Sequence, residues 1–154
     1  MKITLVSDSC FLFEHKGIRL LTDPWIGTSI AGGSWIQYPQ PVISADQVGS
    51  LDYIFISHIH EDHCDLATLR KLDKNARILI MDRKPNFVLN FLKYNQLNFR
   101  EIINLELRSK YTLNDDFSVE VVEADPAHTL NHLIDSSLLL HYEGKTIYFA
   151  NDNP

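Results

Sequence analysis

One stretch of seven residues constrains this chain more than any other: residues 57–63 read Ser-His-Ile-His-Glu-Asp-His. It directly follows the apolar run at residues 53–56, and such a run between polar residues is typical of a buried strand. The cluster is therefore expected where a strand ends and the chain turns, the position at which α/β folds place their chemistry. Imidazole and carboxylate groups at this spacing suit zinc, iron or manganese. A histidine-rich polar loop formed by chance is disfavoured, because the chain has only 7 histidines in 154 residues.

Length and composition predict one folded domain. With 154 residues and 45% hydrophobic side chains the chain can bury a core. A net charge of −6 without a basic block argues against nucleic acid as the main ligand. The sequence shows no signal-peptide pattern and no membrane-spanning apolar run, and two cysteines do not suggest a disulfide framework. We expect a cytoplasmic protein that acts on a small-molecule substrate.

The first residues predict a β-meander. Residues 4–13 are expected to form one strand and residues 18–22 the next, joined by a tight turn. His15 falls in that turn, where we expect a solvated side chain.

A long loop follows the meander. Pro24 ends the second strand, because proline cannot continue the interior of a sheet. Asp23, just before it, fits two roles: a turn former, or a carboxylate that orients a metal-bound histidine. Residues 26–50 lack a regular pattern and carry Trp35 and Tyr38 as aromatic anchors. Loops of this length tend to be functional or disordered.

The segment after the histidine cluster predicts helices and strands in mixed order. Asp65 is expected to cap a helix over residues 66–72, and Cys64 to be a small buried residue. Pro85 is expected at the first position of a second helix. Further strands are expected at residues 78–81, 102–107, 117–123, 137–142 and 146–150. This order favours a mixed sheet covered by helices.

The last third of the chain holds a second set of candidate ligands. His128 and Asp152 each follow an apolar run, which repeats the geometry of the first cluster. His132 is the alternative to His128 as the distal ligand. His141 lies inside an alternating strand pattern, so a structural or exposed role is expected for it.

The pattern His58-x-His60-x-Asp62-His63, with His128 and Asp152 downstream, resembles the metallo-β-lactamase superfamily over almost the whole chain. Three segments make the chain similar to the metallo-β-lactamase-type domain of CMP-N-acetylneuraminate hydroxylases. They are residues 22–25, residues 32–41 and residues 142–154. The similarity extends more distantly to L-ascorbate-6-phosphate lactonase and N-acyl phosphatidylethanolamine phospholipase D.

The resemblance implies an α+β fold, the αββα sandwich of that superfamily. Residues 1–154 would form its N-terminal part, a mixed sheet with helices on one face in a domain truncated at its C-terminus. The family carries one or two divalent metal ions, with zinc expected first and iron or manganese as alternatives. One metal would be held by His58, His60 and His128, a second by Asp62 and His63, and Asp152 would bridge the two. Asp62 would also orient the attacking hydroxide or carry its proton, which makes it the candidate catalytic residue.

Two departures from the family pattern matter. Asn151-Asp152 stands where the superfamily usually has Gly-Asp. The chain also ends before the half that carries a further histidine ligand in the family, so a missing C-terminal half or self-association is expected to complete it.

Three functions are compatible with these features. The first is a hydrolase that attacks a phosphoester, ester or lactone with a metal-bound hydroxide. The second is an iron-dependent oxygenase module that works with a separate Rieske domain, since this sequence has no Rieske ligand pairs. The third is an inactive metal-binding fragment.

Overall fold

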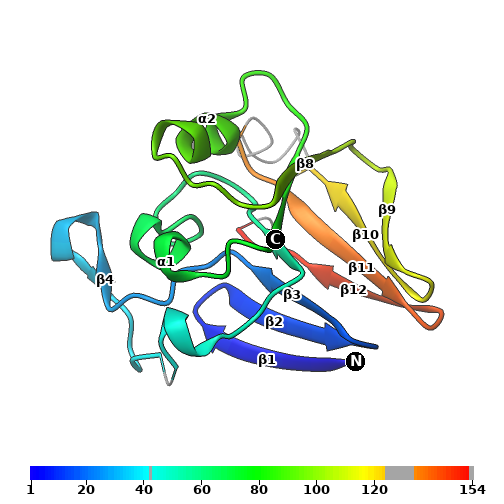
Figure 1. Cartoon of the computed structure of the whole chain (residues 1–154), viewed down its shortest axis with the longest axis horizontal. Helices are drawn as coiled ribbons and strands as arrows, with labels where there is room; N and C mark the ends of the chain where they lie inside the picture. Colours follow the sequence, from blue (N-terminus) through cyan, green and yellow to red (C-terminus); the bar gives the residue numbers. More distant parts are fainter. Residues whose placement is uncertain (42, 124–133, 153–154) are drawn as a thin grey trace.

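The computed structural model describes residues 1–41, 43–123 and 134–152 and shows two β-sheets packed against each other, with helices on the outer face of the larger one (Figure 1). The larger sheet has the strand order β1-β2-β3-β6-β7-β8. Its strands are β1 (Lys2–Ser7), β2 (Cys10–His15), β3 (Ile18–Thr22), β6 (Tyr53–Phe55), β7 (Arg77–Met81) and β8 (Glu101–Leu105). The first three strands are antiparallel, and β3, β6, β7 and β8 pair in parallel.

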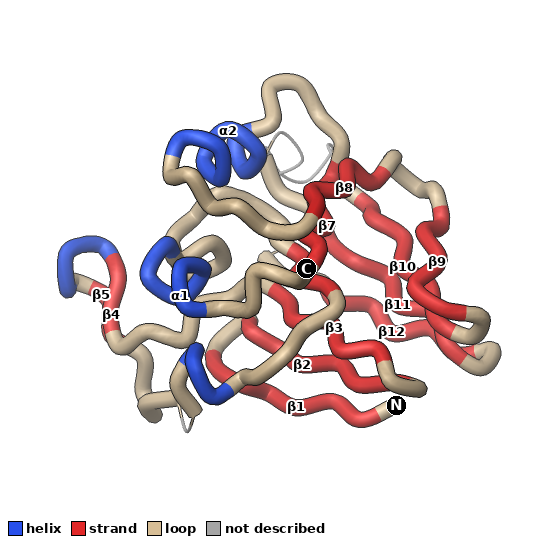
Figure 2. Tube along the Cα trace, viewed as in Figure 1, coloured by secondary structure: helices blue, strands red, loops and turns tan. Residues whose placement is uncertain are grey.

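The smaller sheet is an antiparallel meander in the order β12-β11-β10-β9. Its strands are β9 (Lys110–Asn114), β10 (Phe117–Val122), β11 (Ser137–Tyr142) and β12 (Lys145–Phe149). Figure 2 shows the two sheets as separate red layers, with the helices on the side of the larger sheet away from the smaller one.

The period of two along each strand divides the core into two clusters. In β6, Ile54 faces the helices, whereas Tyr53 and Phe55 face the smaller sheet. Adjacent residues of β3 divide in the same way, with Leu21 on the helix side and Leu20 between the sheets. Because the parallel strands are buried on both faces, they read as continuous apolar runs. This is the mixed sheet with helices on one face that the sequence predicts.

The two α-helices in the described residues begin at side-chain caps. Helix α1 (Leu66–Lys71) starts at Asp65, whose carboxylate accepts hydrogen bonds from the backbone of Ala67 and Thr68 at 3.2 and 2.9 Å. The predicted cap is therefore confirmed. Helix α2 (Phe87–Tyr94) starts at Asn86, whose side chain accepts from Leu89 N. The expectation that Pro85 opens this helix is wrong, because the cap lies one residue after the proline.

The N-terminal strands differ from the prediction. Residues 4–13 do not form one strand, because the chain turns at Asp8 and Ser9 between β1 and β2, with a φ of 34° at Asp8. Aspartate tolerates this left-handed conformation better than most residues. His15 is not solvated: it is 6% exposed and packs edge-on against the rings of Phe117 and Tyr142 in the smaller sheet.

The segment between β3 and β6 is mostly irregular, as expected. It contains the two-residue strands β4 (Ser29–Ile30) and β5 (Trp35–Ile36) and the short 3₁₀ turns η1 (Ala31–Gly33) and η2 (Ala45–Gln47). Figure 1 shows the β4–β5 hairpin projecting from the body of the molecule beyond α1.

Within the described ranges, none of the helices combines the length and apolar character that crossing a bilayer requires.

The α1 cap gives a test of the fold. Replacing Asp65 with alanine removes the acceptor for two backbone N–H groups, so the free energy of unfolding should fall by about 1–2 kcal/mol. Urea denaturation followed by circular dichroism measures this change. The matched control is Asp46→Ala, an exposed aspartate in the first turn of η2 whose side chain makes no cap hydrogen bond. An equal effect of both substitutions would contradict the capping role.

Candidate metal centre

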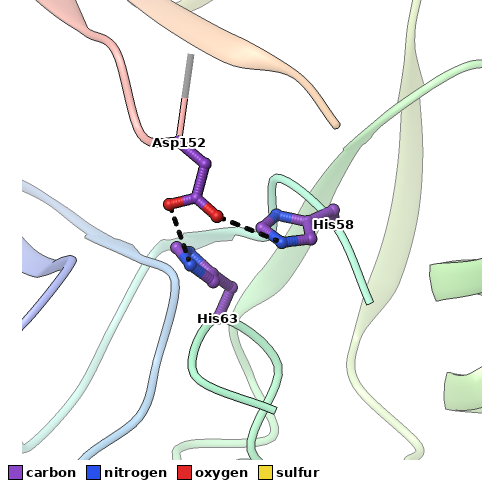
Figure 3. Close-up of side chains that lie close together, drawn as sticks. All are labelled: His58, His63 and Asp152. Carbon is purple, nitrogen blue, oxygen red and sulfur yellow. Dashed lines mark ion pairs between the residues drawn. The ribbon is translucent and has the colours of Figure 1, made fainter. Parts of the chain in front are cut away.

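Two histidines and one aspartate meet at the seam between the two sheets. His58 and His63 come from the loop after β6, and Asp152 follows the last strand of the smaller sheet (Figure 3). The ligand atoms of these three side chains lie within 4.8 Å of one another. Both histidines are buried, whereas the Asp152 side chain is 47% exposed, so the group is open to solvent on the Asp152 side.

His58 is held by its Nδ1 atom. That atom lies 3.1 Å from Oδ1 of the buried Asp135 and 3.0 Å from the Ser57 hydroxyl. The opposite ring nitrogen, Nε2, lies 3.7 Å from Asp152 Oδ2. Asn151 donates a hydrogen bond to the same Asp135 oxygen at 2.7 Å, which fixes the carboxylate behind the ring.

His63 has the same arrangement with different partners. Its Nδ1 atom lies 3.1 Å from Oδ2 of the buried Asp23 and 3.2 Å from the Ser9 hydroxyl. Its Nε2 atom lies 3.4 Å from Asp152 Oδ1 and 3.3 Å from Asp62 Oδ2. In both rings a buried carboxylate therefore contacts Nδ1, and Nε2 points toward Asp152.

Asp23 is a turn former, and its carboxylate also contacts the candidate ligand His63. Its φ of 38° makes it part of the turn after β3, and its carboxylate accepts hydrogen bonds from Ser57 N and Ser57 Oγ, both at 2.8 Å. Burial raises the pKa of Asp23, while hydrogen bonds from His63 and Ser57 oppose that rise.

The electrostatics around His63 favour a positive charge. Burial alone lowers the pKa of this imidazole, but the hydrogen bonds with Asp23 and Asp62 outweigh it and raise the pKa to about 10. The same contact with His63 lowers the pKa of Asp62. Two carboxylates beside one imidazole are a suitable environment for a cation, and a metal ion bound by His63 would replace its proton.

The remaining predicted ligands lie around this group or outside the described residues. Nδ1 of His60 is 2.9 Å from Nε2 of His58, and the two rings meet edge to face. Asp62 approaches from the His63 side. His128 and its alternative His132 fall in residues 124–133, outside the described ranges. The structure thus brings together His58, His60, Asp62, His63 and Asp152, five of the six residues predicted as metal ligands.

Sequence reasoning missed Asp135 and Ser9. Asp135 lies two residues before the apolar strand β11, so the only available signal was an acid near a strand boundary, the same signal that identified Asp23. Ser9 had no signal, since its contact with His63 depends on the unrecognised turn between β1 and β2.

Cys10 and Cys64 are free and buried, and burial raises the pKa of both thiols, so neither is a reactive thiolate. His141 is half-buried away from the site and contacts Glu120 and Thr146, in agreement with the structural role expected for it.

The Asp152 contacts are compatible with a shared metal ion, within a group whose ligand atoms lie up to 4.8 Å apart. Ligands about 2.1 Å from a tetrahedral zinc ion lie about 3.4 Å apart, and the contacts of Asp152 with the two Nε2 atoms are 3.4 and 3.7 Å. Metal-bound histidines commonly hydrogen-bond a carboxylate through the other ring nitrogen, which is the position of Asp23 and Asp135. The donor set of imidazole and carboxylate is compatible with zinc, iron and manganese.

The fold and this site define a metal-dependent class of protein, and comparison with known sequences specifies the family. A family model described as "Beta-lactamase superfamily domain" matches residues 2–150, so the chain belongs to the metallo-β-lactamase superfamily.

Sequence relatives agree with the predicted resemblance. The chain is 33% identical over 75 residues to the cytidine monophosphate-N-acetylneuraminic acid hydroxylase of Asterias rubens, which covers 48% of the chain and 12% of that protein. It is 28% identical over 155 residues to a protein of Mycolicibacterium smegmatis that carries a Rieske 2Fe-2S iron-sulfur protein name. That match covers 99% of the chain and 30% of the relative, so the chain spans less than a third of the relative's length.

Solved structures share the fold. The diiron β-hydroxylase CmlA from Streptomyces venezuelae superposes with a TM-score of 0.70 at 18% identity, covering 98% of this chain and 29% of that one. The isothiocyanate hydrolase from Delia radicum gut bacteria superposes with a TM-score of 0.70 at 19% identity, covering 96% of this chain and 61% of that one. The fold therefore occurs in both hydrolytic and oxidative proteins.

The carboxylates behind the histidines give a test of the site. Asp23→Asn and Asp135→Asn keep the side-chain shape but remove the negative charge beside the Nδ1 atoms of the two histidines. Each substitution should lower metal affinity about 10–100-fold, as measured by competition titration of zinc against a chelator. The control is Asp116→Asn, an exposed aspartate paired with Lys16 on the far edge of the sandwich. Unchanged affinity in both buried variants would show that the metal binds elsewhere.

Proposed function

We propose that the chain is a metal-dependent hydrolase that acts on a phosphoester, ester or lactone. The observation that carries this proposal is the shared direction of the two Nε2 atoms toward the Asp152 carboxylate, with a buried carboxylate behind each ring. A metal ion in this group would lower the pKa of a bound water and so supply a nucleophile near neutral pH.

The protein residues have distinct roles in this proposal. His58, His60, Asp62, His63 and Asp152, with His128 from the residues outside the described ranges, would hold one or two ions. Asp23 and Asp135 would keep the two buried rings in the orientation that ligation needs.

Asp62 is the proposed catalytic residue. Its carboxylate lies beside His63 Nε2 and is only partly buried, so it can reach both the ligand group and solvent. An ionised carboxylate at this position could accept a hydrogen bond from the attacking water and orient it. The exposed side of Asp152 is where a substrate would approach.

The double variant His58→Ala, His60→Ala tests the hydrolase proposal. Loss of two imidazoles should abolish both metal binding and hydrolysis of p-nitrophenyl phosphoesters and esters or of a simple lactone. Elemental analysis and the rate of product release measure the two losses in parallel. His141→Ala is the matched control, since this histidine contacts Glu120 and Thr146 and not the ligand group. Hydrolysis that survives in the double variant would overturn the proposal.

A second function is favoured by the names of the relatives. The match to a Rieske-named protein over 99% of the chain, together with the hydroxylase relative, supports an oxygenase module whose electrons come from a Rieske partner domain. Here the same ligands would hold iron. The neighbouring diiron hydroxylase adds support from the fold alone.

Metal content and oxygen dependence separate the two functions. The hydrolase proposal predicts activity with zinc or manganese that is unchanged when oxygen is removed. The oxygenase alternative predicts iron in the purified protein and turnover that needs both oxygen and an electron donor. A folded, metal-loaded chain that is inert in both assays would support an inactive metal-binding role instead.

A further inference from the structure

A groove of about 730 Å³ lies between β1 and the projecting segment that carries β5. Its lining includes both tryptophans of the chain, Trp25 and Trp35, together with Tyr38. Trp35 is 58% exposed and Tyr38 is 97% exposed, which is unusual for such large rings. Exposed apolar side chains gathered along one groove mark a binding site more often than isolated ones do.

The wall of the groove is tied to the metal centre. Asp8 lines the groove, and its neighbour Ser9 contacts His63 Nδ1 at 3.2 Å and donates a hydrogen bond to the Asp62 carbonyl. The groove therefore connects to the metal centre through the β1–β2 turn, on the Nδ1 side of His63.

Hydrogen bonds fix the floor of the groove. The carbonyl of Trp25 accepts from the Ser7 hydroxyl at 2.5 Å and from the Gln37 side chain at 2.8 Å. These contacts join β1, the segment after β3 and the segment after β5 into one unit. A groove that is ordered before its ligand arrives loses less free energy on binding.

The charge of the lining points to a cation. Asp8 is the one acid among the described residues that line the groove, and none of these residues is Lys, Arg or His. Aromatic faces attract cations, tryptophan most strongly, and substituted ammonium groups suit such sites because their surface is apolar. The net charge of −6 adds a favourable long-range field.

We propose that this groove binds a substituted ammonium group, with the rings of Trp35 and Tyr38 around the cation and the Asp8 carboxylate beside it. Binding in this groove does not depend on the proposed function.

Tryptophan fluorescence of the whole chain tests the proposal directly, because both tryptophans line the groove. The probe is choline, and its neutral match is 3,3-dimethyl-1-butanol, in which carbon replaces the charged nitrogen. Choline should change the emission saturably and bind roughly tenfold more tightly than the neutral compound. Equal binding of the two compounds, or no response to choline, would overturn the proposal.

Variants assign the binding to the groove. Asp8→Asn keeps a residue that tolerates the positive φ of this turn, and Tyr38→Ala alters a fully exposed ring, so both should fold. Each should weaken choline binding severalfold. Tyr94→Ala removes an 88% exposed tyrosine on α2 and should leave binding unchanged. Full choline binding in both groove variants would place the cation elsewhere.

The same titration in the His58→Ala variant separates this proposal from the proposed function. The groove residues are intact there, so choline should still bind. If the chain binds choline but does not hydrolyse the test substrates, the hydrolase proposal fails and the groove proposal holds. If it hydrolyses them but does not bind choline, only the groove proposal fails.

Discussion

The contact on which the site depends is the one between the buried Asp23 carboxylate and the segment that follows β6. Asp23 donates its backbone N–H to Phe55 O at 2.9 Å, and its carboxylate binds Ser57 and His63. One residue at the end of β3 therefore sets the path of the neighbouring strand and the orientation of a candidate ligand. A buried carboxylate is costly unless it is paired and hydrogen-bonded, and here Ser57 and His63 provide those partners.

The smaller sheet provides a matching support from the other side. Asp135 contacts His58 Nδ1, and its neighbour Ser136 donates a hydrogen bond to Ser57 O at 2.9 Å. The two histidines are thus held from different sheets, and the ligand group forms only where the sheets meet. Packing of Phe55 and Leu79 against Val119, Val121 and Leu138 keeps the sheets in contact, so core and site depend on the same alignment.

Short-range sequence patterns predict part of this structure. The loop at residues 57–63, the cap at Asp65 and most strands follow from short-range spacing, because an apolar run or a side-chain cap is visible within a few residues. Contacts between distant segments were not visible. His15 looked like a turn residue because nothing near it shows that Phe117 and Tyr142 pack on it. Strand β9 was missed because Leu113 is its one buried residue, which leaves hardly any apolar alternation to detect. Asp135 and Ser9 reach the histidines through tertiary structure alone.

The position of a bound metal tests the proposed ligand group most directly. Crystals of the chain loaded with zinc, measured on both sides of the zinc absorption edge, would give an anomalous peak at each ion. We expect a peak about 2.0–2.2 Å from Nε2 of His58 or His63 and from an Asp152 oxygen, with Nδ1 of the ligating ring still in contact with its buried carboxylate. An ion bound through Nδ1, or located away from these three side chains, would show that this group is not the metal site.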